Sequence, residues 1–285
     1  MMSENWNEII SSGKSKKISL RELWSYRDLV ILFVRRDFVK EFKQTILGPL
    51  WFVIQPIFQT CIVLFMFGKI GGLGPQGIPQ ISFYLGGVLM WNLFSENLVK
   101  TSETFRANAN IFGKVYYPRL VMPIAQIITS FLKLLVQLSI FFVAYFYELY
   151  SSPAIDPNIG ILLVPVYFLI AAILGTGLGL IISSLTTKYW DLRFLVQFGV
   201  QLLMFVSTVT VSFSVLADKP VWMQNAIVAN PVSSIIEAFR NAFLGPLGGE
   251  IYVPGLIYSC TFAVLSLIVG IIIFNRVEKN FMDTV

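Results

Sequence analysis

The sequence contains no histidine, and only 13% of its 285 residues are charged. Without imidazole, the chain cannot form a histidine-ligated metal site, a Ser-His-Asp triad or a Cys-His pair. A soluble domain usually carries about 25% charged residues, so this chain has too little polar surface for water to cover. Hydrophobic residues make up 56% of the chain. We therefore expect the main solvent of this protein to be a lipid bilayer.

Cysteine and phosphate-binding motifs are also scarce. Cys61 and Cys260 stand in separate apolar runs, so we expect buried, inert thiols. The tripeptide at 13–15 resembles the end of a P-loop, but Glu8 occupies the position of its first glycine. We expect the chain to be no enzyme and to bind no cofactor or metal. The first 20 residues hold no apolar run, so membrane insertion is expected to begin at an internal segment.

Long apolar runs predict the spanning segments. Five charge-free runs, and a sixth interrupted by Lys133, exceed the roughly 20 residues that cross a bilayer. Because a helix satisfies its own backbone in hydrocarbon, we expect an all-α membrane protein with six transmembrane helices. Their expected bounds are about 49–68, 80–99, 120–147, 159–185, 194–216 and 252–275. They form a transmembrane domain over 49–275, between a cytoplasmic segment 1–48 and a cytoplasmic tail 276–285.

The positive charges predict the orientation. Seventeen Lys and Arg residues fall in 1–48, in the connections on that side and in the tail after residue 275, against three on the opposite side. Cytoplasmic loops carry the excess of positive charge, so both termini are expected in the cytoplasm. The net charge of +5 is thereby explained by the membrane, and no nucleic-acid partner is expected.

An amphipathic helix is predicted before the first span. Apolar residues recur every four positions, and Arg35, Arg36 and other charged residues take the remaining faces. Such a helix suits the headgroup region and should end at Gly48 and Pro49. Packing on a soluble partner is the alternative, and the two faces allow both. The apolar positions are Val30, Val34, Phe38, Phe42 and Ile46.

The connection before the last span predicts a pair of short helices. Residues 221–229 and 232–244 are apolar but too short to span, and Asn230 and Pro231 separate them. We expect a re-entrant hairpin at about 220–249 that dips in from the outer side, with a flat hairpin on the outer surface as the alternative. Glu237 and Arg240 are three residues apart and can pair on one helical face.

Polar residues inside the spans indicate what the spans contact. Lys133 is predicted to pair with Glu96, to snorkel or to face an aqueous path. Glycines at 175–179 predict close helix packing. Amide and aromatic side chains on the first and fifth spans suit a sugar chain, although for each residue taken singly ordinary packing between helices is the favoured explanation. The candidate channel-lining residues are Gln55, Phe58, Gln59, Phe65, Phe198, Gln201 and Phe205.

Several segments together resemble the membrane subunits of ABC-2-type exporters for O-antigen, capsular polysaccharide and teichoic acid. They are residues 35–37, 42–51, 55–56, 108–111, 114–119, 189–194, 230–231 and 274–283. The resemblance covers nearly the whole chain in order. Trp190 departs from it, because a charged or small polar residue is expected before the aspartate there.

The resemblance implies a homodimer in the bacterial inner membrane that pairs with two copies of a separate ATPase, which would bind ATP and Mg²⁺. A lipid-linked polysaccharide would pass outward between the two copies. Docking of the ATPase would involve Arg35, Arg36, Glu103, Arg106, Lys114, Tyr189, Trp190, Asp191 and Arg193, and the outer gate would include Asn230, Pro231, Glu237 and Arg240. A membrane-embedded glycan-processing enzyme and an ion-coupled secondary transporter are the alternatives.

Overall fold

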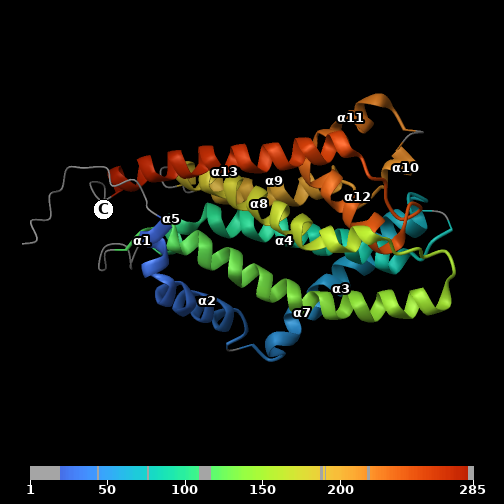
Figure 1. The fold of residues 1–285 in the computed structure, drawn as a ribbon, viewed down its shortest axis with the longest axis horizontal. Helices are drawn as coiled ribbons and strands as arrows, with labels where there is room; N and C mark the ends of the chain where they lie inside the picture. Colours follow the sequence, from blue (N-terminus) through green and yellow to red (C-terminus); the bar gives the residue numbers. More distant parts are fainter. Residues whose placement is uncertain are drawn as a thin grey trace, which may run out of the picture.

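The structure is a computed structural model that describes residues 20–43, 45–75, 77–108, 117–186, 189, 191–216 and 219–281. Within these ranges the ordered elements are helices, and no strand occurs. The helices form an elongated bundle (Figure 1). The all-α prediction is confirmed.

Four segments are long and apolar enough to cross a bilayer: Gly48–Ile70, Val121–Ser151, Ile159–Thr186 and Val253–Val277. They contain α3 (Trp51–Val63) with its π-helical continuation η2 (Leu64–Ile70), α7 (Val121–Ser151), η3 (Ile159–Leu163) with α8 (Val164–Thr186), and most of α13 (Val253–Phe281). These segments overlap the first, third, fourth and sixth predicted spans.

The second predicted span coincides with α4 (Gln80–Ser102), which lies at the centre of the bundle. Its side chains from Ser82 to Trp91 are all buried, and it packs mainly against α8 and α7. Close packing with α8 depends on Gly175 and Gly179, where an added Cβ would lie 2.4 Å from the Phe94 carbonyl oxygen and 2.7 Å from the Leu98 one. The glycine-rich run is therefore a packing site, as predicted.

The fifth predicted span is interrupted. Helix α9 (Leu192–Phe205) ends well before residue 216, and only the short α10 (Phe213–Leu216) follows. Between them, Ser207 donates to the Met204 carbonyl and Thr210 to the Ser207 carbonyl. Hydroxyl groups that bond to nearby carbonyls compete with helix formation, which explains why an apolar run of this length is not one helix.

The predicted pair of short helices is present. Helix α11 (Val221–Ala229) and helix α12 (Pro231–Leu244) meet at Asn230, whose side chain accepts a hydrogen bond from the Val232 N–H and caps α12. Only Ile227 of helix α11 is buried, whereas every residue of α12 after Pro231 is buried. They lie with α10 at one end of the bundle, here called the hairpin end (Figure 1).

The opposite end, here called the terminal end, holds α1 (Leu20–Ser25), α5 (Thr104–Ala107) and the end of α13 (Figure 1). Helix α2 (Arg27–Phe42) packs there against α7. It ends at Phe42 rather than at 48, and Ile46 is fully exposed beyond it. The predicted end is wrong because the chain becomes extended at Lys43 and turns through Gly48, which has φ +53°.

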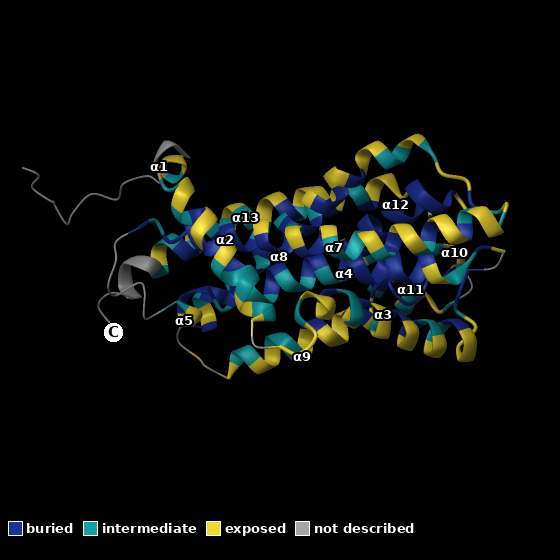
Figure 2. Cartoon of the chain, turned by 90° about the horizontal axis from the view of Figure 1, so that it is seen from below, coloured by how far each residue is buried: buried dark blue, intermediate teal, exposed yellow. Residues whose placement is uncertain are grey.

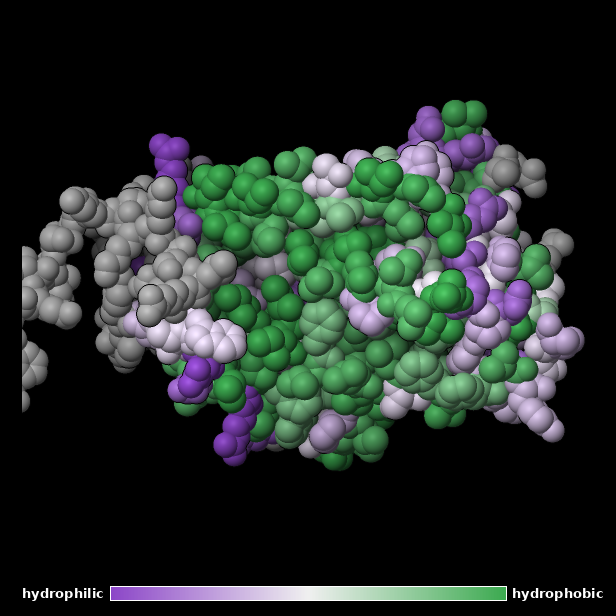
Figure 3. Space-filling model, viewed as in Figure 1, coloured by the Kyte–Doolittle hydropathy of each residue, from purple (hydrophilic) through white to green (hydrophobic). Residues whose placement is uncertain are grey.

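The outer surface of the bundle is apolar along its middle and more polar at the hairpin end (Figure 3). The outward faces of the long helices are exposed, and the buried residues gather between them (Figure 2). Cys61 and Cys260 are exposed on α3 and α13, so the prediction of buried thiols is wrong. An apolar side chain on a spanning helix can face lipid and needs no burial in protein.

Candidate functional site

A cavity of about 1020 Å³ lies between α3, α4, α7 and α9. Five glutamines line it, joined by Asn92 and Ser95 and by several aromatic rings. Within the described part of the chain, the amides of Gln55, Gln137 and Gln201 have no hydrogen-bond partner, so they can bind a ligand or water. The glutamines are Gln55, Gln59, Gln137, Gln197 and Gln201, and the aromatic residues are Trp51, Phe52, Phe67, Trp91 and Phe205.

Four of the seven predicted channel-lining residues, Gln55, Gln59, Gln201 and Phe205, therefore share this cavity. The other three, Phe58, Phe65 and Phe198, have exposed fractions of 59–65% and lie on the outer surface of α3, η2 and α9. The wall residues Asn92, Ser95 and Gln137 were not among the predicted lining set. Nothing in their local pattern separates them from residues that pack between helices.

Four charged side chains form one cluster at the cavity wall, here called the charge cluster: Glu41, Glu96, Lys100 and Lys133. Each carboxylate contacts both ammonium groups, including Glu96 with Lys100 at 3.2 Å. Lys133 is 4% exposed and also lies 5.4 Å from the centre of the Phe52 ring. The predicted pairing of Lys133 with Glu96 is confirmed. The role of Glu41 was missed, because a charge on an interfacial helix gives no sign that it reaches a distant span.

An ion pair joins the two connections predicted to dock an ATPase. The Nε atom of Arg193, at the start of α9, lies 2.6 Å from a Glu103 carboxylate oxygen beside α5. The same carboxylate accepts a hydrogen bond from Gln197 at 3.2 Å. Of the other residues predicted to dock the ATPase in these connections, Arg106, Tyr189 and Asp191 are exposed. Lys114 and Trp190 lie outside the described residues.

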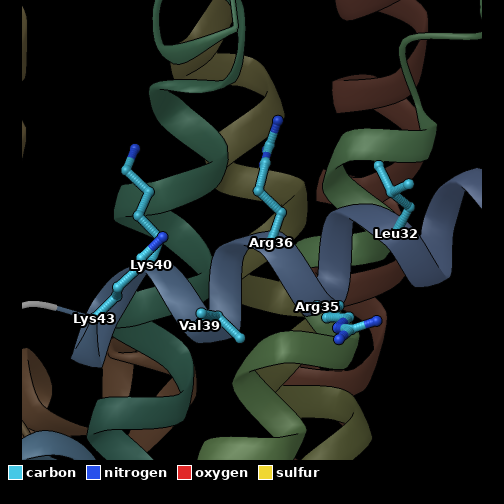
Figure 4. A pocket seen from close by; sticks show the side chains of 6 residues that line it. All are labelled: Leu32, Arg35, Arg36, Val39, Lys40 and Lys43. Carbon is cyan, nitrogen blue, oxygen red and sulfur yellow. The ribbon is translucent and has the colours of Figure 1, made fainter.

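Helix α2 carries a basic groove of about 550 Å³, lined by Leu32, Arg35, Arg36, Val39, Lys40 and Lys43. Arg36 and Lys40 extend to the same side of the helix (Figure 4). Arg36 is held by Asp37 at 2.7 Å and by Asn108 at 3.3 Å, so the groove adjoins the first connection. On the buried face, Phe33 packs on Tyr117, and burial raises the pKa of Tyr117 to about 12.

The predicted gate residues lie on α12 or at its start. Arg240 is 1% exposed, and its guanidinium donates to the carbonyls of Phe83, Thr208 and Val209. It also donates to Glu237 at 3.4 Å, the pairing that the spacing predicts. Asn230 donates to the Val206 carbonyl at 2.8 Å. Helix α12 is thus bonded to α4 and to the non-helical segment after α9.

Two observations limit the chemistry of the chain. Among the described residues, no group of three or more His, Cys, Asp or Glu side chains could hold a metal ion. The polar groups around the cavity are amides, hydroxyls and mutually paired ions, which can bind a ligand through hydrogen bonds and charge.

Comparison with known families decides the identity. The family model of the ABC-2 type transporter matches residues 28–244, most of the chain. The chain belongs to the ABC-2 type transporter family. The matched region contains α2, the cavity, both connections and α12. As an ABC-2 protein, the chain is a transporter membrane subunit rather than an enzyme, and a multi-pass protein of the bacterial inner membrane.

Individual relatives support this assignment. The ABC-2 chain is 26% identical over 258 residues to an O-antigen export system permease protein, RfbA, of Klebsiella pneumoniae, covering 90% of this chain and 94% of the relative. It is 24% identical to the RfbA protein of Myxococcus xanthus over 225 residues, covering 79% and 83% of the two chains.

Proposed function

We propose that this ABC-2 subunit forms the membrane path of an ATP-driven exporter that moves a lipid-linked polysaccharide from the cytoplasmic side of the inner membrane to the outer side. Its relatives are named as O-antigen export permeases, which makes an O-antigen-like glycan the first candidate cargo. ATP would be hydrolysed by a partner subunit, because the chain has no complete phosphate-binding motif.

The observation that carries the proposal is the amide- and ring-lined cavity between α3, α4, α7 and α9. Sugar rings present apolar C–H faces, which pack on aromatic rings, and hydroxyl groups, which exchange hydrogen bonds with amides. The amides of Gln55 and Gln201 can form hydrogen bonds with sugar hydroxyl groups in many orientations, so they do not select one sugar position. A wall of this kind permits a long polymer to move without being trapped at a single step.

The path requires a second copy of the chain. Helix α3, its continuation η2 and helix α9 expose large apolar side chains beside the cavity, including Phe58, Phe65 and Phe198 at 59–65%. A second copy that packed there would extend the cavity into a channel and would bring these rings to its wall. Lipid alone would cover them equally well, so the homodimer is part of the proposal.

The same proposal includes the membrane topology. We infer six spans with both termini in the cytoplasm, in which α4 is the second span and α9 with the following segment is the fifth. A helix of 14 residues reaches only about 21 Å, so the buried segment after Phe205 completes the crossing. Helices α11 and α12 would form the outer re-entrant pair, and the basic groove on α2 and the Arg193–Glu103 pair would meet the ATPase.

The test is reconstitution in proteoliposomes with a radiolabelled lipid-linked glycan. The chain together with its ATPase should move glycan in an ATP-dependent manner, and neither subunit alone should do so. Movement or nucleotide hydrolysis by the isolated chain would overturn the proposal. Movement driven by a proton gradient without ATP would favour a secondary transporter instead.

A further inference from the structure

The charge cluster combines two features that a purely structural ion pair does not need. It lies on the wall of the cavity, and it brings two ammonium groups, Lys100 and Lys133, to the same Glu96 oxygen. Both ammonium groups are therefore within reach of a single phosphate or diphosphate. Lys133 is nearly fully buried, so its charge must always have an anionic or strongly polar partner.

The two carboxylates are held differently. Glu96 is on α4, the central helix of the bundle, and is four residues from Lys100 on that helix. Glu41 is on α2, near the point where that helix ends. Lys100 and Lys133 lie on the long helices α4 and α7, whereas Glu41 is one residue from the end of α2, and residues 45–47 beyond it are non-helical. Glu41 is thus the member of the cluster that can leave while the two lysines remain in place.

We infer that Lys100 and Lys133 form an anion site in the cavity wall for the phosphate or diphosphate group of a lipid-linked substrate, and that Glu41 occupies this site when no substrate is bound. The inference rests on the proposed function for the class of substrate. The observation behind the inference is that the Glu41 carboxylate bridges both ammonium groups, as two phosphate oxygens would. Lysine is a common phosphate ligand, and exchange of one anion for another leaves no buried charge unpaired.

The position of the charge cluster suits the point where the glycan and the lipid chain of such a substrate are joined. The polar wall with Gln55 and Gln201 continues from the cluster and would take the glycan. Ile62 on the adjoining α3 and Met66 on η2 line the cavity and are exposed at 62% and 52%, and this surface would take the lipid chain. The anionic linker between the two parts would then lie beside Lys133.

The test measures binding to the purified full-length chain in detergent, without an ATPase. The probes are geranylgeranyl diphosphate, the corresponding alcohol geranylgeraniol, and inorganic diphosphate. Replacement Glu41→Gln removes the competing charge and should tighten binding of geranylgeranyl diphosphate about tenfold, without changing binding of the alcohol. The double replacement Glu41→Gln with Lys133→Gln should weaken binding at least tenfold relative to Glu41→Gln alone.

Asp28→Asn is the matched control, because it also removes one carboxylate from α2, at an exposed position outside the charge cluster. It should leave the affinity within twofold of wild type. If the double variant is not monodisperse, Glu41→Gln with Lys100→Gln provides the same test. Tightening confined to the prenyl diphosphate supports a lipid-linked anion, and equal tightening for inorganic diphosphate supports a site for the free ion.

Unchanged or weaker binding of both diphosphates in Glu41→Gln would overturn the inference, as would equal tightening in Asp28→Asn. Such a failure would leave the proposed export function intact, since that function is judged by ATP-dependent movement of glycan in the complete transporter. Conversely, diphosphate binding that responds to Glu41 in a chain unable to export would refute the proposed function alone.

Discussion

Replacement of Arg240 by methionine should destabilise the protein strongly. Arg240 is buried and donates to three main-chain carbonyls, those of Phe83, Thr208 and Val209, at 2.9 Å and 3.1 Å for the first and third. Its guanidinium also lies 3.6 Å from the centre of the Phe83 ring. Methionine fills much of the same volume but satisfies none of these groups, and it leaves the Glu237 carboxylate buried without its cation.

The magnitude follows from the buried pair. Breaking a buried ion pair by removing one partner costs about 3–5 kcal/mol. A change of 1 kcal/mol shifts the melting temperature of a chain of 150–250 residues by about 2–4 °C. We therefore expect Arg240→Met to lower the apparent melting temperature of the detergent-purified protein by roughly 10 °C. Tryptophan fluorescence during a thermal ramp would measure the shift.

Two controls distinguish the loss of the Glu237–Arg240 ion pair from the effect of replacing an arginine by methionine. Arg276→Met makes the same replacement at an exposed position on α13 and should shift the melting temperature by less than about 2 °C. Glu237→Gln combined with Arg240→Met removes both charges, and glutamine still accepts from Ser212 and the Glu250 N–H. The double variant should recover at least half of the loss. Equal destabilisation of the single and double variants would refute the reasoning.

Three further predictions concern packing, coupling and the cavity. Gly175→Ala should lower stability by more than about 2 kcal/mol in the same thermal assay, because its Cβ would lie 2.4 Å from a carbonyl oxygen, whereas Gly199→Ala meets nothing within 4 Å and should be neutral or stabilising. Arg193→Glu should uncouple ATP turnover from export in proteoliposomes by repelling Glu103. Gln201→Leu should slow export several-fold with unchanged ATPase assembly, as judged by transport and by size-exclusion chromatography.

Each of these has an outcome that would contradict it. Equal effects of the two glycine replacements would mean that the α4–α8 approach is not tightly packed. Normal coupling in Arg193→Glu, or a Glu103→Arg and Arg193→Glu swap that fails to restore coupling, would contradict the role of this ion pair. Normal export by Gln201→Leu would remove this amide from the transport path.

Local chemistry determined which parts of the fold could be predicted. The α11–α12 pair begins and ends within a residue of its predicted bounds, because Asn230 and Pro231 act on their own neighbours. Asn230 caps α12, and proline is favoured in a first helical turn. The close packing of α8 could be predicted for the same reason, because its glycines lack the side chains that would keep a neighbouring helix away.

Long-range contacts account for what could not be predicted. The break after α9 depends on Arg240, which binds the freed carbonyls of Thr208 and Val209 from more than 30 residues away. A hydropathy pattern cannot report such a bond, so an uninterrupted apolar run was expected to be one helix. Glu41 likewise reaches Lys133 only because α2 folds back along α7.

Helix α12 at the hairpin end and helix α2 at the other end of the proposed path are held by different kinds of bond. This difference predicts which of the two helices moves first. At the hairpin end, Arg240 is buried and donates to main-chain carbonyls, which are fixed parts of the backbone. At the α2 end, the contact is formed by the Glu41 carboxylate with the ammonium groups of Lys100 and Lys133. A ligand anion can replace Glu41, but nothing comparable can replace a carbonyl.

We therefore expect α2 to move before α12 during the transport cycle. Spin labels at Lys40 and Leu135, both exposed, would report the separation of α2 from α7 in the complete transporter. Labels at Ile81 and Leu247, exposed at 47% and 58%, would report the hairpin end. Substrate without ATP should broaden only the first distance distribution, because substrate alone can displace Glu41. Broadening of the second distribution alone would place the first movement at the outer gate and contradict the argument.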